Sequence, residues 1–413
     1  MDKNRERALH LATEAGHILL ENGAEITRVE ETMERISSTY GVEEKGFFVL
    51  SNGIIATGEG YAKAKFIPIK GTQLSKIVEV NQVSRDVTSG KCTLDELETR
   101  LKDIRNDKQK PWWEMIPCIT LGIMGFSIIF GCSFIDMYSS LLTGLLLGSF
   151  ITFAGKYLSR FFNNLICGFI GALLCVMAYY VFGSFGIHLN LPNIIVGNMI
   201  ALVPGVPFTN GIRDLVNEDY IAGFTRLLDA LIVFFCIALG VIAAFYLGEL
   251  CFGDMNTLDR PVYDSVTSAW YIQMIAAFVG TLGFSALFGA PRRYYLACGL
   301  VGMIGWMAYI FTHSILLASL IIAVVSHIFA VIQRCPVTVF LICGIIPLVP
   351  GGGLFWTLYY LLTNHLRLAY ETGTDAIKCT IAIAGGIIVG AAIFDRLLKK
   401  KQKISTKTTR FGR

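Results

Sequence analysis

Charged side chains are scarce through most of this chain. Of its 31 Asp and Glu and 35 Lys and Arg residues, only 12 acidic and 10 basic residues lie within 114–394. A charge at the centre of a bilayer costs roughly 3 kcal/mol on insertion scales, so this long, sparsely charged stretch indicates many membrane-spanning segments. Together with 54% hydrophobic residues and a mean hydropathy of +0.58, it excludes an ordinary soluble globular protein.

Signatures of catalysis and of metal binding are also missing. Residues 1–113 contain no Walker loop, dinucleotide fingerprint or nucleophile elbow. No Cys-x-x-Cys occurs among the 11 cysteines, which we expect to pack as small hydrophobes. The charged start from Asp2 to Arg7 shows no signal peptide. We therefore expect no cofactor, no metal and no drive by ATP, and a membrane-anchored enzyme with a catalytic N-terminal domain is a lesser alternative.

Ten apolar runs have the length of a membrane-spanning helix. They fall at about 115–131, 137–155, 165–183, 191–210, 223–248, 267–289, 294–311, 314–332, 337–362 and 376–394. We therefore predict a polytopic α-helical membrane protein of about ten helices. The membrane region would follow a small α+β cytoplasmic domain over 1–113, and it would precede a basic cytoplasmic tail over 398–413.

The distribution of Lys and Arg predicts the orientation of these spans. If 1–113 is cytoplasmic, the inner loops receive seven bases: Lys156, Arg160, Arg213, Arg226, Arg292, Arg293 and Arg334. The outer loops receive three: Arg260, Arg367 and Lys378. The positive-inside rule then places both termini in the cytoplasm, in a multi-pass protein of the cell (inner) membrane. The basic tail would contact lipid headgroups rather than nucleic acid.

The apolar region repeats itself. Ala-Leu-Val-Pro-Gly-Val-Pro at 201–207 is matched 146 residues later by Pro-Leu-Val-Pro-Gly-Gly-Gly at 347–353. Gly-Phe-Ser at 125–127 is likewise matched at 283–285. Because five spans per half is an odd number, the second half would cross the membrane upside down, as in inverted-repeat transporters. The halves would cover 114–250 and 267–397, with an external connecting loop over 251–266.

The two Pro-Gly breaks form the predicted substrate site. Proline removes a backbone donor and glycine loosens the chain, so amides and carbonyls of a broken helix become free to bind a polar ligand. A proline-kinked packing helix is the alternative interpretation. The assigned residues are Asn198, Pro204, Gly205, Thr209, Asn210, Pro350, Gly351 and Gly352.

Three ionisable side chains in the apolar region are candidates for proton coupling: Asp229, His327 and Asp375. Each aspartate lies three residues from a base, Arg226 or Lys378, and near a span end, where a charged side chain can reach the interface. Histidine is a side chain that can relay a proton, which makes His327 a candidate, but a hydrogen-bonded structural histidine fits equally well.

The first 113 residues predict helices and short strands. The helices are expected over 5–20, 25–40 and 75–87, the strands within 46–70, and a last helix after Thr93, where Glu96 completes a capping box. Glu25, Arg28 and Glu30 could form a site, but a solvated helix face with i,i+3 pairing is the simpler interpretation.

Three of these segments resemble a known family. Asn-Gly-Ala-Glu-Ile-Thr-Arg-Val-Glu at 22–30, Val-Asn-Gln-Val-Ser-Arg-Asp at 80–86 and the helix at 93–101 look like the cytoplasmic domain of the threonine/serine exporter family. The spans with their duplicated Val-Pro-Gly resemble its membrane region. In some members of the family these parts are divided between two chains. Here the two chains look fused into one, with the join near 250–266.

The resemblance implies secondary active export of small polar metabolites, driven by an ion gradient that we take to be protons. Fused members export threonine and serine, and split members export dicarboxylates such as succinate, which leaves a dicarboxylate as the alternative cargo. On the family pattern, Gly23, Arg28 and Glu30 belong to the motif of the cytoplasmic domain. The expected partners are the substrate, protons, membrane lipids and a second copy of the chain in a homo-oligomer.

Overall fold

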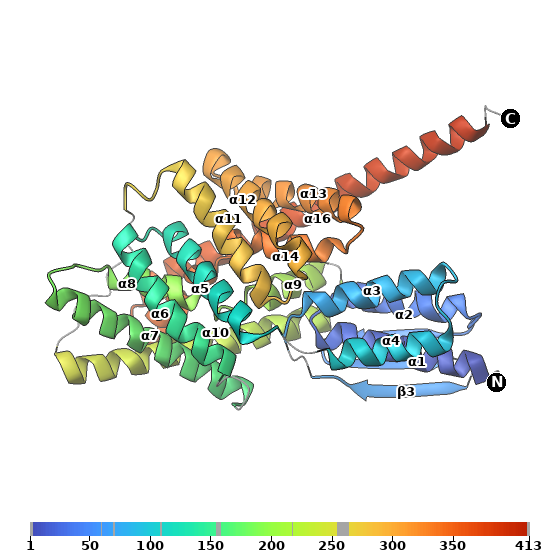
Figure 1. Ribbon diagram of the computed structural model, residues 1–413, viewed down its shortest axis with the longest axis horizontal. Helices are drawn as coiled ribbons and strands as arrows, with labels where there is room; N and C mark the ends of the chain where they lie inside the picture. The colour runs from blue at the N-terminus through green and yellow to red at the C-terminus, as the bar shows by residue number, and fades with distance from the viewer. Residues whose placement is uncertain are drawn as a thin grey trace. The chain divides into compact units, whose positions relative to one another are not determined.

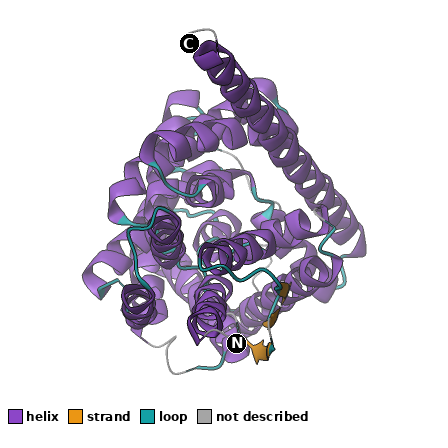
Figure 2. Ribbon diagram, turned by 90° about the vertical axis from the view of Figure 1, so that its right-hand side faces the viewer, coloured by secondary structure: helices purple, strands orange, loops and turns teal. Residues whose placement is uncertain are grey.

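The computed structural model describes residues 3–58, 60–68, 71–107, 110–153, 158–216, 218–253 and 264–410. Helices dominate these residues, and the strands form one small sheet (Figure 2). The chain divides into two compact units. Unit 1 comprises Met1–Pro111, Val206–Leu231 and Leu287–Arg292, and unit 2 comprises Trp112–Gly205, Ile232–Ala286 and Arg293–Arg413.

Unit 1 contains the helices and strands that the first 113 residues predict (Figure 1). They are α1 (Lys3–Glu21), α2 (Ile26–Thr39), β1 (Gly46–Leu50), β2 (Gly53–Gly58), β3 (Tyr61–Phe66), α3 (Leu74–Thr88) and α4 (Leu94–Asn106). The strands form an antiparallel sheet in the order β1-β2-β3, and Leu50 pairs with Gly53 across a tight turn. The predicted capping box at Thr93 and Glu96 is confirmed, with both of its hydrogen bonds present.

Unit 1 also includes two segments from the apolar part of the sequence. One is the segment 206–231, and the other is 287–292, at the end of α11. Phe288 and Gly289 accept hydrogen bonds from the amides of Leu74 (3.0 Å) and Ser75 (2.8 Å). These amides open α3 and have no acceptor within their own helix, so the 287–292 segment caps it.

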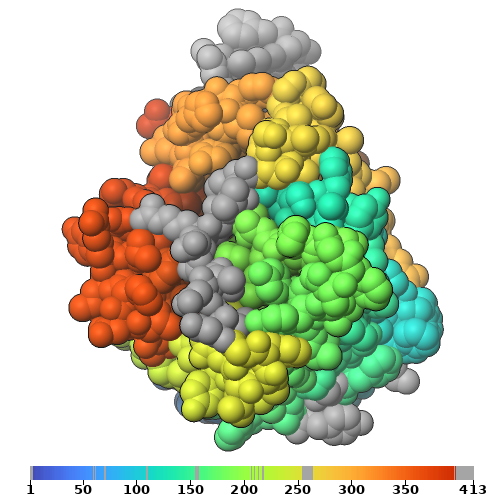
Figure 3. Space-filling view, turned by 90° about the vertical axis from the view of Figure 1, so that its left-hand side faces the viewer, coloured from blue at the N-terminus to red at the C-terminus, as the bar shows by residue number. Residues whose placement is uncertain are grey.

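Unit 2 holds most of the long apolar helices. In the first half of the apolar region the helices are α5 (Trp112–Ile129), α6 (Phe134–Phe153), α7 (Arg160–Ser184), α8 (Leu191–Met199), α9 (Gly205–Val216) and α10 (Tyr220–Phe252). In the second half they are α11 (Trp270–Leu287), η1 (Arg292–Tyr294), α12 (Tyr295–Thr312), α13 (Ile315–Gln333), α14 (Val337–Ile345), η2 (Ile346–Leu348), α15 (Gly351–Leu362) and α16 (Leu366–Arg410). Both halves contribute to the face seen in Figure 3, through α7 and the end of α10 and through α15 and α16.

Eight described helices are long and apolar enough to cross a membrane, and the count is nine if the pair α14–α15 with η2, bent by 50°, forms one span. The protein is therefore a polytopic helical membrane protein. The predicted span over 191–210 corresponds to α8 and α9, of 9 and 12 residues, separated by residues 200–204. Each is shorter than a bilayer requires, so ten spans stay a prediction that depends on these two acting as one.

Some predicted features lie outside the described residues. Residues 254–263 of the predicted external loop are among them, as are Lys156 and Arg260, and the side chains of Thr209 and Arg213 are not described. The predicted tail begins within α16, which continues to Arg410.

The crossing of α5 and α11 is symmetric. Phe126 and Phe284 stack with ring centroids 5.0 Å apart and planes 13° apart. A Cβ added to Gly280 would lie 3.0 Å from the Phe126 ring, and one added to Gly122 would overlap the Phe284 ring. The two glycines and the two phenylalanines match in the sequence at an offset of 158, and the glycine of each helix lies against the phenylalanine of the other.

Candidate functional site

The two Pro-Gly breaks contact each other. A Cβ added to Gly351 would lie 2.5 Å from Cγ1 of Val203, and one added to Gly205 would lie 3.1 Å from Cγ1 of Val349. At an offset of 146 residues, Val203 corresponds to Val349 and Gly205 corresponds to Gly351. The contact is therefore reciprocal, because the glycine of each break lies against the valine of the other. Segments far apart in the sequence therefore meet at the positions where glycine leaves room for the valine of the other break.

Each break has the same local geometry. The Gly205 amide donates to the Val203 carbonyl at 2.8 Å, and the Gly351 amide donates to the Val349 carbonyl at 2.7 Å. The proline between the two residues donates no hydrogen bond, so the chain turns there and a new helix begins at the glycine, α9 or α15. The first amides of a helix have no acceptor within it and carry partial positive charge, so these ends attract anionic groups.

The predicted polar side chains around the first break have different surroundings. Asn198 is 0% exposed, its amide donates to the Ile194 carbonyl at 3.0 Å, and its oxygen accepts from Thr143 at 3.1 Å. It thereby ties α8 to α6. Asn210 is buried in unit 1, and the side chain of Thr209 lies outside the described residues.

Trp356 is a residue of the second break that the sequence did not single out. It is 6% exposed, and its indole Nε1 has no hydrogen-bond partner among the residues that the structure describes. The residue lies four positions after Gly352 in α15 and therefore on the same helix face. The signal in the sequence is an aromatic donor one turn after a triple glycine, which is hard to distinguish from ordinary core packing.

The candidate proton carriers differ in their surroundings. Asp375 forms the predicted pair with Lys378, at 3.3 Å, and both side chains are 76% exposed. His327 Nδ1 lies 2.8 Å from the Ala323 carbonyl, which is the structural hydrogen bond that the sequence left as an alternative. Asp229 is half-buried on α10.

Arg226, which the sequence placed beside Asp229, forms a buried ion pair with Asp214 of α9. Nη1 of Arg226 lies 2.7 Å from Oδ2 of Asp214, and the two side chains are 3% and 2% exposed. A second nitrogen of the guanidinium donates to the Ala24 carbonyl at 2.8 Å. Arg226 thus joins α10, α9 and the N-terminal motif within unit 1.

The motif around residues 22–30 is less exposed than predicted. Glu25 is 4% exposed, so its assignment to a solvated helix face is wrong. The Val49 amide donates to Glu30 at 3.3 Å, and burial, with the charge of Asp219, raises the pKa of Glu30. Arg28 Nε is buried without a partner. Gly23 has a φ of +83°, a conformation that a side chain would strain.

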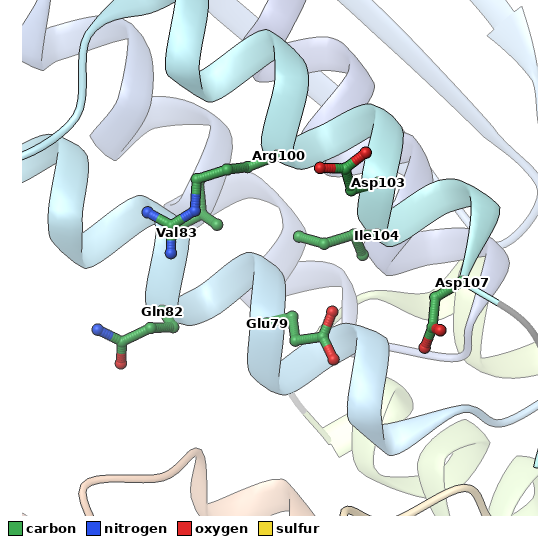
Figure 4. Close-up of a pocket in the computed structure, with 7 residues that line it drawn as sticks. All are labelled: Glu79, Gln82, Val83, Arg100, Asp103, Ile104 and Asp107. Atoms are coloured by element: carbon green, nitrogen blue, oxygen red, sulfur yellow. The ribbon is translucent and has the colours of Figure 1, made fainter.

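A surface pocket of about 420 Å³ lies between α3 and α4 (Figure 4). It is lined by Glu79, Gln82, Val83, Arg100, Asp103, Ile104 and Asp107, none of which is a predicted site residue. Arg100 is held at its edge by Asp86, at 2.8 Å. We assign no role to this depression.

Comparisons with known proteins give matches over most of the chain. Models of the threonine/serine exporter family match residues 10–248 and 273–393. The chain is 22% identical to the threonine/serine exporter of Corynebacterium glutamicum over 94% of its length and 83% of the relative. It is 19% identical to a probable threonine/serine exporter of Mycobacterium tuberculosis, over 94% of this chain and 77% of the relative.

A further relative matches the first part of the chain. It is a probable succinate transporter subunit of Klebsiella aerogenes, 22% identical over 59% of this chain and 95% of the relative. No solved structure gives a significant match. With family models covering both halves of the apolar region, the chain belongs to the threonine/serine exporter family, whose members are transporters and not enzymes.

Proposed function

We propose that this protein exports threonine and serine by alternating access around the paired Val-Pro-Gly breaks. The observation that carries the proposal is the reciprocal contact of Val203 with Gly351 and of Val349 with Gly205. Broken helices in matching places of two inverted halves are typical of the substrate sites of secondary transporters. The exporter names of two relatives that match 94% of this chain support the cargo.

The proposed transporter lies in the cell membrane with both termini in the cytoplasm and uses the proton gradient. The excess of Lys and Arg in the predicted inner loops supports this orientation. Asp229 is the preferred proton carrier. It is half-buried in unit 1, three residues from the buried Arg226, whereas Asp375 forms an exposed ion pair.

The N-terminal unit has a positioning role in this proposal. Arg226 binds both Asp214 of α9 and the Ala24 carbonyl, and α9 begins at the first break. Movement of α9 between transport states would therefore be resisted or transmitted by the N-terminal motif. Glu30 and Arg28 contribute to the same motif, and the positive φ of Gly23 shapes the turn before Ala24.

A dicarboxylate such as succinate is the second candidate cargo. The N-terminus of α15 begins at the second break and favours an anionic group, which would suit a carboxylate. The partial match to a succinate transporter subunit supports the same possibility.

Transport into inverted membrane vesicles tests both candidates. Vesicles with and without the protein are given an imposed proton gradient and labelled threonine, serine or succinate. We expect accumulation of threonine and serine that requires both the protein and the gradient. Accumulation of succinate alone would identify a dicarboxylate as the cargo in place of threonine and serine. Accumulation without a gradient would refute the coupling to protons. No accumulation of any of the three would refute export.

A further inference from the structure

The indole N–H of Trp356 is a buried donor without an acceptor. The side chain is 6% exposed, and within the described part of the chain Nε1 has no hydrogen-bond partner. Buried tryptophans normally place this N–H against an acceptor, because leaving a donor unpaired away from water is unfavourable. Trp306 of the same unit follows that rule, since its Nε1 donates to Gln273 at 3.0 Å. No acceptor among the described residues uses the donor of Trp356, so it is available to a ligand.

The position of Trp356 relates this donor to the second break. Trp356 lies four residues after Gly352, on the same face of α15, and helical side chains lean back toward the preceding turn. A Cβ on Gly352 would lie 3.3 Å from Val196 and 3.6 Å from the Phe130 ring. Trp356 belongs to the same apolar cluster as Val196 and Phe130. Trp356 is therefore on the helix face that Gly352 turns toward this cluster, one turn after the start of α15.

Neighbouring rings hold the indole in place. It stacks on Tyr360 at 5.3 Å and meets Tyr359 edge-on at 5.5 Å and Phe355 at 5.4 Å. All four residues come from α15, so the arrangement is set by one helix. The result is an oriented N–H donor in apolar surroundings, where a hydrogen bond to a charged acceptor is stronger than in water.

We propose that Trp356 Nε1 binds the carboxylate of the transported amino acid at the second break. This inference rests on the proposed function. The indole offers a donor and no acceptor, and the first amides of α15 are donors at the positive end of the helix, so both select an anionic acceptor over an ammonium group. One carboxylate oxygen accepts from Nε1, and the other faces the first turn of α15. Other groups of the protein bind the ammonium and hydroxyl groups of the substrate.

The test compares ligand binding by purified wild-type protein and the Trp356→Phe variant. Phenylalanine retains an aromatic ring but lacks the N–H donor and the second ring of the indole, and the comparison with threoninol below separates these two losses. We expect threonine to bind about ten- to a hundred-fold more weakly to the variant, as for the loss of a hydrogen bond to a charged group. Threoninol, in which a hydroxymethyl group replaces the carboxylate, should bind equally to both proteins. Trp306→Phe is the matched control and should bind threonine as the wild type does, because its N–H already has a partner in the protein.

The outcomes separate this inference from the proposed function. If the wild type binds none of threonine, serine or succinate, the proposed function fails and this inference fails with it. If the wild type binds threonine and Trp356→Phe binds it equally well, only the role of Trp356 is refuted. An equal loss of threonine and threoninol affinity would show that Trp356 does not read the carboxylate.

A second measurement leaves Trp356 in place. The chain has five tryptophans, and phenylalanine can replace the other four, Trp112, Trp113, Trp270 and Trp306. Threonine should then change the fluorescence emission of the remaining Trp356, and threoninol should not shift it in the same way. If saturating threonine leaves the emission unchanged, the indole does not contact the substrate and the inference is wrong.

Discussion

Gly351 has no side chain where Val203 packs. A Cβ at residue 351 would lie 2.5 Å from Cγ1 of Val203, well inside van der Waals contact. The repeat partners of these residues, Gly205 and Val349, make the same contact in reverse, with a distance of 3.1 Å. The glycine of each break thus accommodates the valine of the other, and the pair of contacts holds the two broken helices together.

We expect Gly351→Ala to impair transport at least tenfold while the protein still inserts in the membrane. The added methyl group would displace Val203 and separate the two breaks, and overpacking of this kind costs about 1–3 kcal/mol. Val203→Ala in the same chain should restore part of the activity by making room. Gly385→Ala is the control, because its nearest neighbour would lie at an ordinary 3.8 Å. Normal transport by Gly351→Ala would show that the contact of the breaks is not needed.

Arg226→Met should strongly destabilise unit 1. It would leave the carboxylate of Asp214 buried without its cation, and breaking a buried pair from one side costs about 3–5 kcal/mol. Arg226→Met combined with Asp214→Leu should recover part of this loss. The comparison is Arg367→Met, which breaks an exposed pair with Glu371 and should cost at most about 1 kcal/mol. Thermal unfolding of the purified variants measures both effects, and similar losses for the two single variants would contradict the prediction.

Asp229→Asn and Asp375→Asn should differ in proton coupling. Asp375 is an exposed partner of Lys378, so its loss should leave gradient-driven uptake nearly unchanged. Asp229 is half-buried, and its neutral replacement should abolish the dependence of uptake on the imposed pH gradient. Uptake by Asp229→Asn that keeps the wild-type response to the gradient would identify another carrier, and His327→Gln would be the next variant to test.

Glu30 predicts a specific change of stability with pH. Burial, with the negative charge of Asp219, raises its pKa above the usual 4.5, although the Val49 amide partly opposes this shift. A raised pKa in the folded state means that Glu30 contributes stability at low pH and loses this contribution as pH rises through its folded pKa. Glu30→Gln should therefore gain stability over the wild type above that pKa and lose little below 4.5. The melting temperature, measured from pH 4 to pH 8, should separate the two proteins only toward the alkaline side.

Local features of this protein could be predicted from sequence because they depend on neighbours along the chain. The capping box at Thr93 and Glu96 was predicted as the structure has it, and the strands lie within the predicted range. The short connection after Thr312 also separates two helices, since His313 adopts a left-handed conformation and ends α12. Proline and glycine likewise marked both breaks, because they disrupt a helix wherever they stand within it.

Features that depend on contacts between distant segments were missed or misread. Glu25 looked like part of a solvated helix face, and it is buried. Asn198 looked available to a ligand, whereas Thr143 and the Ile194 carbonyl use its polar atoms. The sequence could not identify Trp356 as an unpaired donor, since that property exists only once every neighbouring acceptor has a position.

The sequence by itself determined the membrane class, the apolar segments, the two matching breaks and the resemblance to an exporter family. Low charge, hydrophobic length and Pro-Gly chemistry act locally, so they can be read without a fold. Only the tertiary structure decided that Val203 meets Gly351 and that Arg226 pairs with Asp214 and binds the Ala24 carbonyl. Burial and the partners of hydrogen bonds and ion pairs are set by the packing of residues far apart in the chain. That packing brings the two similar Pro-Gly segments together in one candidate site.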